Sequence, residues 1–193
     1  MARPQQFDHD QVLRDAMTLF WQRGYEATSI KDLTSATRLQ PGSLYGAFKN
    51  KRNLFLLSLD CYFADLEAGV TCLMHAETPP LQRIHQFFTH LLKESARDKE
   101  FRGCLLVNTL LEVPAEDAEI NQRVTAMLQK VELELRAALE EARTKGDLAA
   151  HKNPEALART LISGVFGMRV YNRMNPGKKA LQSIADNLLS MLD

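Results

Sequence analysis

One stretch decides the fold of the N-terminal part: Tyr25-Glu26-Ala27-Thr28-Ser29-Ile30, then Pro41-Gly42-Ser43-Leu44-Tyr45, then Lys49-Asn50-Lys51-Arg52. Thr28 is predicted to cap a short helix, because threonine is a favoured N-cap residue. Pro41 suits the first turn of the next helix, where its missing N–H is not needed. Asn50 is predicted to cap a longer helix. The stretch therefore predicts two short helices joined by a turn and followed by a long helix.

Hydroxyls, amides and cations gather at the ends of these short helices, which is typical of a helix-turn-helix that lies against DNA. Gly42 and Ser43 keep the start of the second short helix slim enough to approach base edges, and Tyr45 is long enough to reach a phosphate. The predicted DNA contacts are Thr28, Ser29, Arg38, Gln40, Pro41, Gly42, Ser43, Tyr45, Lys49 and Lys51. Each of them alone also fits an ordinary turn, but their order on compatible helices favours DNA.

Apolar residues recur with helical spacing along the whole chain, and no run shows the alternation of a strand. Nine helices are predicted, at residues 8–23, 29–37, 41–47, 50–74, 78–96, 104–112, 114–145, 154–173 and 177–192, behind a polar arm at residues 1–8. We therefore expect an all-α protein with a helix-turn-helix head, residues 1–50, and a helical effector-binding and dimerisation domain, residues 51–193. The long fourth helix belongs to both, so movement of the head is expected to be tied to the body.

Charge is distributed unevenly, although the formal net charge is zero. Residues 1–56 carry eight Lys and Arg against five Asp and Glu, whereas the rest of the chain carries sixteen against nineteen. A basic front and an acidic back fit a DNA-binding head on a body that does not bind nucleic acid. The apolar runs are too short to span a bilayer and no leader opens the chain, so we expect a cytoplasmic protein without membrane contact.

Cys61, Cys72 and Cys104 show no CxxC spacing. Reduced thiols are therefore expected rather than a disulfide framework or a zinc site, and no metal or cofactor is predicted. The sequence also has no Gly-rich phosphate loop, no HExxH motif and no nucleophile–base set, so an all-α enzyme is a weak alternative. A helical module that binds another protein is the other alternative.

The front of the chain resembles the tetracycline-repressor family of bacterial regulators. The resemblance rests on the run from Gly24 to Ile30, on Gly42-Ser43-Leu44-Tyr45-x-x-Phe48 and on Lys51-x-x-Leu54-Phe55. It implies an all-helical homodimer whose first three helices bind a palindromic operator and whose other helices hold a pocket for a small-molecule effector. Two positions depart from the family pattern: Arg38 stands where a glycine is frequent, and Ala47 stands where His or Tyr often contacts a phosphate.

Two apolar stripes near the C-terminus are predicted to form a four-helix bundle across a two-fold axis, because a palindromic site needs two heads. The predicted dimer contacts are Leu157, Leu161, Gly164, Val165 and Met168 on one helix and Leu181, Ile184, Leu188 and Leu192 on the next. A glycine such as Gly164 inside a helix indicates close helix approach or room for a ligand. The alternative is that both helices pack wholly within one subunit.

An apolar cavity with a few polar groups would suit a hydrophobic or aromatic effector. The predicted lining residues, each of which also fits ordinary core, are Phe63, Phe87, Phe88, Leu91, Cys104, Asn108, Met127, Phe166 and Tyr171. Cys104 stands at a predicted helix start close to Arg102, where a helix dipole and a cation would favour the thiolate. The segment resembles a branch of the family in which a similarly placed cysteine senses electrophiles. A small buried apolar residue is the alternative interpretation of Cys104.

Overall fold

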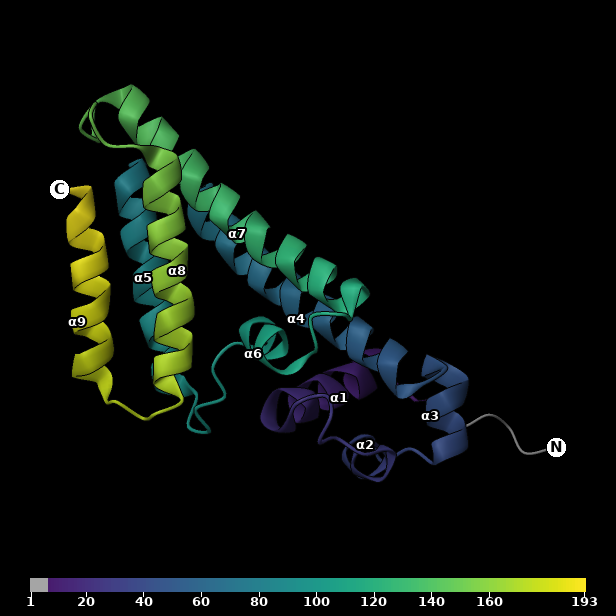
Figure 1. Cartoon of the computed structure of the whole chain (residues 1–193). Coiled ribbons are helices and arrows are strands. Elements are labelled where there is room, and N and C mark those ends of the chain that lie inside the picture. Colours follow the sequence, from purple (N-terminus) through teal and green to yellow (C-terminus); the bar gives the residue numbers. More distant parts are fainter. Residues whose placement is uncertain (1–6) are drawn as a thin grey trace.

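The computed structural model describes residues 7–193, and helices account for nearly all of that range (Figure 1). The helices are α1 His9–Arg23, α2 Ile30–Thr37, α3 Pro41–Phe48, α4 Lys51–Met74, α5 Pro80–Arg97, α6 Leu105–Glu112, α7 Ala118–Lys145, α8 Pro154–Asn172 and α9 Lys178–Leu189, with a 3-10 turn at Ser190–Leu192. The predicted all-α, nine-helix fold is therefore confirmed over residues 7–193. The arm predicted at residues 1–8 lies mostly outside the described residues. Within residues 7–193, no helix combines the length and the apolar character that crossing a membrane requires.

The molecule is elongated, with a small head at one end and a larger helical body at the other (Figure 1). Helices α1, α2 and α3 form the head, and α4 runs from the head into the body beside α7. Helices α5, α8 and α9 stand together at the far end, and the short α6 lies between that group and α1 (Figure 1). Because α1 packs along α4, no flexible linker separates the head from the body.

Local capping explains most of the helix boundaries. Gly24 ends α1 with a positive φ of 85°, which glycine adopts without strain. The Asn50 side chain accepts a hydrogen bond from the Asn53 amide at 2.8 Å and so caps α4 as predicted. The predicted start of the seventh helix at Pro114 is wrong: residues 113–117 form a turn, and Asp117 is the N-cap of α7.

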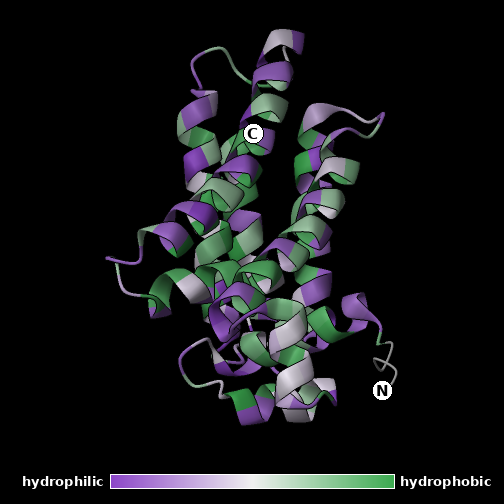
Figure 2. Ribbon diagram, turned by 90° about the vertical axis from the view of Figure 1, so that its right-hand side faces the viewer, coloured by the Kyte–Doolittle hydropathy of each residue, from purple (hydrophilic) through white to green (hydrophobic). Residues whose placement is uncertain are grey.

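A continuous apolar core runs from the head into the body. In Figure 2 hydrophobic residues recur along the helices that make up the bundle. Leu44 and Phe48 hold α3 to the head, and both residues are buried. Phe55 on α4 lies between α1 and the α1–α2 loop, with its ring centroid 5.0 Å from that of Phe20 and 4.7 Å from that of Tyr25. Aromatic contacts of this kind fix the head on the start of α4.

Candidate nucleic-acid interface and ligand pocket

Helix α3 presents a slim, polar outer face. Pro41, Gly42 and Ser43 are exposed, and a side chain added at Gly42 would meet no other atom within 4 Å. Tyr45, one turn further on, is 42 % exposed although it is a large aromatic residue. The face opposite to these residues is buried in the head. The structure therefore leaves the N-terminal half of α3 free to approach a groove of DNA.

The turn before α3 and the residue after it bring two exposed cations to the same helix. Arg38 adopts the left-handed conformation, with φ of 57°, at the position where the family pattern frequently has a glycine. A non-glycine residue there costs on the order of 1 kcal/mol. Lys49 follows α3 with φ of 66°, and its side chain is exposed. Both side chains are free to contact phosphates beside α3.

Thr28 is not the cap of α2, and its predicted phosphate contact is wrong. Its side chain is fully buried, and its hydroxyl donates to the Gly24 carbonyl at 2.6 Å. Ser29 is the N-cap, and it forms a capping box in which its hydroxyl accepts from the Asp32 amide at 3.2 Å and the Asp32 carboxylate accepts from the Ser29 amide at 3.0 Å. Hydrogen bonds from the Ser29 hydroxyl and backbone amide hold the pKa of Asp32 below its ordinary value. The Ser29-x-x-Asp32 spacing carried this signal in the sequence.

Two cations at the start of α4 have structural partners. The Lys51 ammonium lies 4.4 Å from the centroid of the Tyr25 ring and 3.4 Å from the Glu26 carbonyl oxygen. Arg52 instead forms ion pairs with Asp117 at 2.6 Å and Glu119 at 2.9 Å. The Arg52 hydrogen bonds lower the pKa of Asp117 to about 2. Lys51 therefore remains near the predicted interface, whereas Arg52 ties α4 to α7.

Glu112 at the end of α6 binds the head directly. Its carboxylate accepts hydrogen bonds from the backbone amides of Tyr25 at 3.0 Å and Glu26 at 2.8 Å. A side chain at Gly24 would overlap the same carboxylate, so close approach also requires glycine there. Helix α6 is thus joined to the α1–α2 loop, which leads into the helix-turn-helix.

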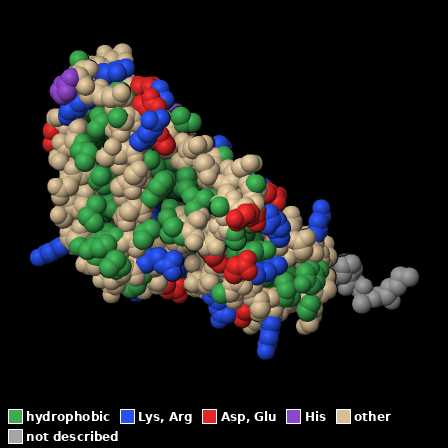
Figure 3. All heavy atoms as spheres, viewed as in Figure 1, with side chains coloured by type: hydrophobic (Ala, Val, Ile, Leu, Met, Phe, Trp, Pro, Cys, Tyr) green, Lys and Arg blue, Asp and Glu red, His purple; other side chains and the backbone are tan. Residues whose placement is uncertain are grey.

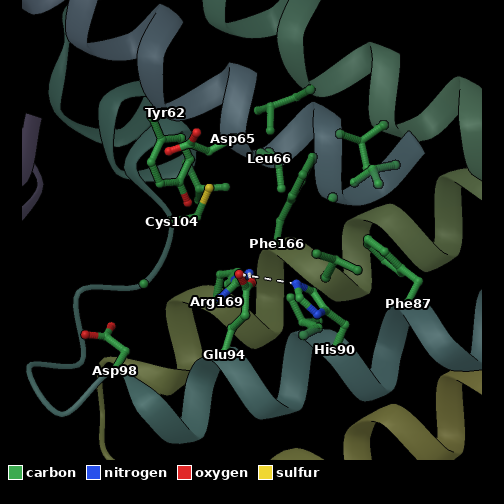
Figure 4. Close-up of a pocket in the computed structure, with 18 of the residues that line it drawn as sticks. Tyr62, Asp65, Leu66, Phe87, His90, Glu94, Asp98, Cys104, Phe166 and Arg169 are labelled. Atoms are coloured by element: carbon green, nitrogen blue, oxygen red, sulfur yellow. Dashed lines mark hydrogen bonds and ion pairs between the residues drawn. The ribbon is translucent and has the colours of Figure 1, made fainter. Parts of the chain in front are cut away.

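A cavity of about 390 Å³ lies in the body between α4, α5, α6, α7 and α8 (Figure 4), and Trp21 of α1 is also part of its lining. Four of the predicted pocket residues line it: Phe87, Leu91, Cys104 and Phe166. Sequence reasoning missed several other lining residues, which come from helices far apart in the chain. They include Trp21, Tyr62, Asp65, Leu66, His90, Glu94, Asp98, Arg102, Val131 and Arg169.

The other predicted pocket residues lie elsewhere. Phe63, Phe88 and Met127 are buried in the core without lining this cavity. Asn108 lines a separate hollow where α1 meets α6, and its Nδ2 donates to the Arg102 carbonyl at 2.8 Å. Tyr171 is partly exposed on the outside of α8. These corrections share one cause: helical spacing shows that a residue faces inward but not which neighbour it meets.

A strip of polar groups, of which Arg169 is the most buried, crosses one wall of the cavity (Figure 4). The Arg169 guanidinium lies 2.6 Å from Glu94, and the other oxygen of Glu94 lies 3.4 Å from His90. Burial opposes the charge of Arg169, but Tyr62, Cys104 and Glu94 outweigh it and raise the pKa of Arg169. Burial, together with Cys104, also raises the pKa of Tyr62. Arg169 therefore stays positively charged at this wall, which suits the wall to a polar group on an otherwise apolar ligand.

Cys104 is the N-cap residue of α6 and is buried at the cavity wall. The predicted neighbour Arg102 is held away from the thiol, because it binds Asp98 at 2.9 Å and stacks over the Trp21 ring at 4.1 Å. Arg169 is the guanidinium that lies below Tyr62 and Cys104 on the cavity wall. Figure 4 shows Tyr62 and Cys104 side by side above Arg169.

The two predicted dimer stripes divide into inner and outer residues. The inner ones are buried within a single chain, as the alternative interpretation of these helices requires: Leu161, Val165, Met168, Leu181 and Leu192. The half-buried ones are Leu157, Gly164, Ile184 and Leu188. A side chain at Gly164 would overlap Leu188, so this glycine allows close packing of α8 on α9 in the same chain. The half-buried residues therefore remain predicted dimer contacts.

Comparisons with known proteins agree with this architecture. Residues 12–57 match the family of bacterial regulatory proteins, tetR family, and residues 80–188 match the tetracyclin repressor-like C-terminal domain. The HTH-type transcriptional repressor ComR of Escherichia coli K12 is 28 % identical over 98 % of this chain and 91 % of its own length.

Solved structures extend the agreement. A double cysteine mutant of the TetR family regulator CifR, complexed with 26-base-pair operator DNA, is 28 % identical and has a TM-score of 0.88 over 97 % of this chain and 98 % of its own. The reduced form of Escherichia coli NemR shares the fold, with 20 % identity and a TM-score of 0.83 over 93 % of each chain. The chain therefore belongs to the tetR family of bacterial regulatory proteins, as a DNA-binding transcriptional regulator and not an enzyme.

Proposed function

We propose that this protein is a transcriptional repressor that binds a palindromic operator as a homodimer and leaves it when a small molecule enters the cavity between α4 and α8. The observation that carries this proposal is the exposed outer face of α3, where Ser43, Tyr45 and Lys49 stand free beside the turn residues. CifR has been solved in complex with operator DNA, and ComR is named a transcriptional repressor. Both relatives support operator binding and repression as the proposed role. Residues 1–50 would then bind DNA, and residues 51–193 would bind the effector and the second subunit.

The proposed dimer forms through the outer faces of α8 and α9. Apolar side chains are exposed on this side of α8 and on the neighbouring α6, and Figure 3 shows hydrophobic side chains gathered there. They are Leu110, Leu111, Val170, Tyr171 and Met174. Exposed patches of this kind commonly mark protein interfaces. Ile184 and Leu188 of α9 are half-buried, so part of each side chain is still exposed on α9.

The cavity favours an apolar or aromatic effector that carries one polar group. Phe87, Leu91 and Phe166 supply apolar wall, while Arg169 and Glu94 supply the polar strip. Trp21 adds a hydrogen-bond donor, because its Nε1 is buried without a partner among the described residues. An effector with a hydrogen-bond acceptor would satisfy that donor, which is costly to leave unpaired.

The route from the cavity to the head is proposed to run along α6. Cys104 and Val107 at its start line the cavity, and Glu112 at its end holds the amides of Tyr25 and Glu26. An effector that prefers a shifted α6 would move the α1–α2 loop and with it the spacing of the two heads. It can do so only by as much as it prefers the shifted state.

The proposal is tested by selecting genomic fragments that bind the purified full-length protein. We expect the selected fragments to share an inverted repeat, and the logarithm of the affinity to fall with the logarithm of salt by about 0.9 for each phosphate neutralised. Genes beside that repeat would narrow the class of effector. Selection of fragments without a common repeat, or affinity that does not depend on salt, would contradict the proposal.

Cys104 is proposed to be the residue that responds if the effector is an electrophile or an oxidant. Its place at the start of α6 and on the cavity wall supports this, since modification there would add bulk between α6 and α8. Cys104→Ser is expected to bind the operator normally but to stay bound when the electrophile N-ethylmaleimide is added. Fluorescence anisotropy of labelled operator measures both. Cys72→Ser, at an exposed thiol on α4, is the matched control and should still be released. Release of Cys104→Ser by the electrophile would rule out this thiol.

A further inference from the structure

A second cavity, of about 560 Å³, lies at the end of the α5, α8 and α9 group where α9 begins. The C-terminal half of α5, the segment after it, the α8–α9 loop and the first turns of α9 line it, and these parts meet at the lower end of this helix group in Figure 1. Asp98 is its only lining residue shared with the cavity beside Cys104. The two cavities are therefore separate sites.

Asn172, the last residue of α8, lines this cavity and carries an unpaired hydrogen-bond donor. The side chain is only 3 % exposed, and its Nδ2 has no hydrogen-bond partner among the described residues. A buried donor without a partner costs about 1–3 kcal/mol. Buried polar groups in proteins are normally satisfied. An acceptor supplied from outside the chain would remove this cost.

The start of α9 adds further donors to the same cavity. Gly177 is the N-cap, so no side chain caps the helix, and the first turn contains no acidic residue. The free amides and the positive end of the helix dipole therefore favour an anion. Lys178 lines the cavity from the first turn of α9, and Lys93 and Lys99 line it from the other side.

The single carboxylate in the lining is already neutralised. One oxygen of Asp98 accepts the Arg102 backbone amide at 2.7 Å, and the other accepts the Arg102 side chain at 2.9 Å. An anion that enters the cavity would therefore meet three lysines and no unpaired carboxylate. Apolar surface from Leu92, Phe101 and Leu181 completes the lining.

We propose that this second cavity binds a small amphipathic organic anion, a carboxylate carrying a short apolar or aromatic group. Its carboxylate accepts hydrogen bonds from Asn172 Nδ2 and the first amides of α9, close to Lys178. Its apolar group packs on Leu92, Phe101 and Leu181. The site goes beyond the proposed function, because neither operator binding nor the cavity beside Cys104 requires it.

The test is a titration of the full-length protein with benzoate, followed through the backbone amide NMR signals. We expect saturable shifts at Lys178, Lys179 and Ala180, and none of comparable size with benzamide, which has the same ring without the charge. Asn172→Asp preserves the shape of the side chain but replaces the donor with a negative charge. It is expected to weaken benzoate binding at least about tenfold, because a hydrogen bond to a charged group is lost and repulsion is added.

Two lysines in consecutive positions give matched controls. Lys178→Ala removes a lining cation on the surface and is expected to weaken benzoate binding several-fold, so it also serves if Asn172→Asp does not fold. Lys179→Ala removes a cation outside the lining and should change the affinity by less than about twofold. The proposal is overturned if benzoate does not bind, if its shifts appear only around Trp21 and Cys104, if Lys178→Ala and Lys179→Ala behave alike, or if benzamide binds as well. If inorganic phosphate binds and benzoate does not, the proposal of an amphipathic organic anion is also overturned.

Discussion

Phe55→Ala is expected to lower the free energy of unfolding by about 4 kcal/mol, as large-to-small substitutions of buried aromatic residues do. The Phe55 ring is 1 % exposed and contacts the rings of both Phe20 and Tyr25. It therefore joins α1, the α1–α2 loop and α4 at one point. Removing it leaves a cavity at the place where the head is attached to the body. Urea denaturation followed by circular dichroism measures the loss.

The matched control for this substitution is Leu133→Ala on α7. The Leu133 side chain is 58 % exposed, so its removal should change the free energy of unfolding by less than about 0.5 kcal/mol. Operator affinity of Phe55→Ala should fall together with the stability, because the position of α3 depends on the same core. A loss of less than about 1 kcal/mol in Phe55→Ala would mean that the head is not packed on α4 as described.

The double substitution Tyr45→Ala and Lys49→Ala is expected to weaken operator binding about a hundredfold, because two contacts to phosphates, each of about 1.5 kcal/mol, are lost. Both side chains are exposed at α3, and neither contributes to the core of the head. The free energy of unfolding should therefore stay nearly unchanged. Fluorescence anisotropy at several salt concentrations measures the affinity, and the salt slope should fall by about 0.9 for the lost lysine contact.

Lys130→Ala provides the control for charge alone. Lys130 is exposed on α7 and pairs with Glu67 in the body, far along the chain from α3. Its removal changes the net charge by the same amount as Lys49→Ala, but it should leave the operator affinity within about twofold. If the double variant binds the operator as tightly as the unchanged protein, α3 is not the element that contacts DNA.

Local signals were sufficient to predict the head. Gly24, Pro41 and Asn50 act within one helical turn of themselves, so each boundary that they set could be predicted from nearby residues. The prediction failed where two neighbours competed for one role. Both Thr28 and Ser29 can cap a helix, and the structure gives the cap to Ser29 because Asp32 completes its capping box.

The body was predictable as helices but not as sites. Phe87 and Phe88 are adjacent and both buried, yet only Phe87 lines the cavity beside Cys104. Arg102 is close to Cys104 in sequence, but Trp21 and Asp98 hold its side chain elsewhere. Arg169, which shares the cavity wall with Cys104, comes from a helix much later in the chain. Which side chains meet depends on how the helices pack, and helical spacing alone does not contain that information.

The sequence by itself determined the helical class, the helix-turn-helix and its free α3 face, because capping and amphipathic spacing act over a few residues. Only the tertiary structure decided the contacts that link function across the molecule. Glu112 reaches the amides of Tyr25 and Glu26, and the end of α8 brings the unpaired Asn172 to the start of α9. These contacts join residues that are distant in the chain or separated by a turn. They exist because burial of the apolar faces sets one arrangement of the helices.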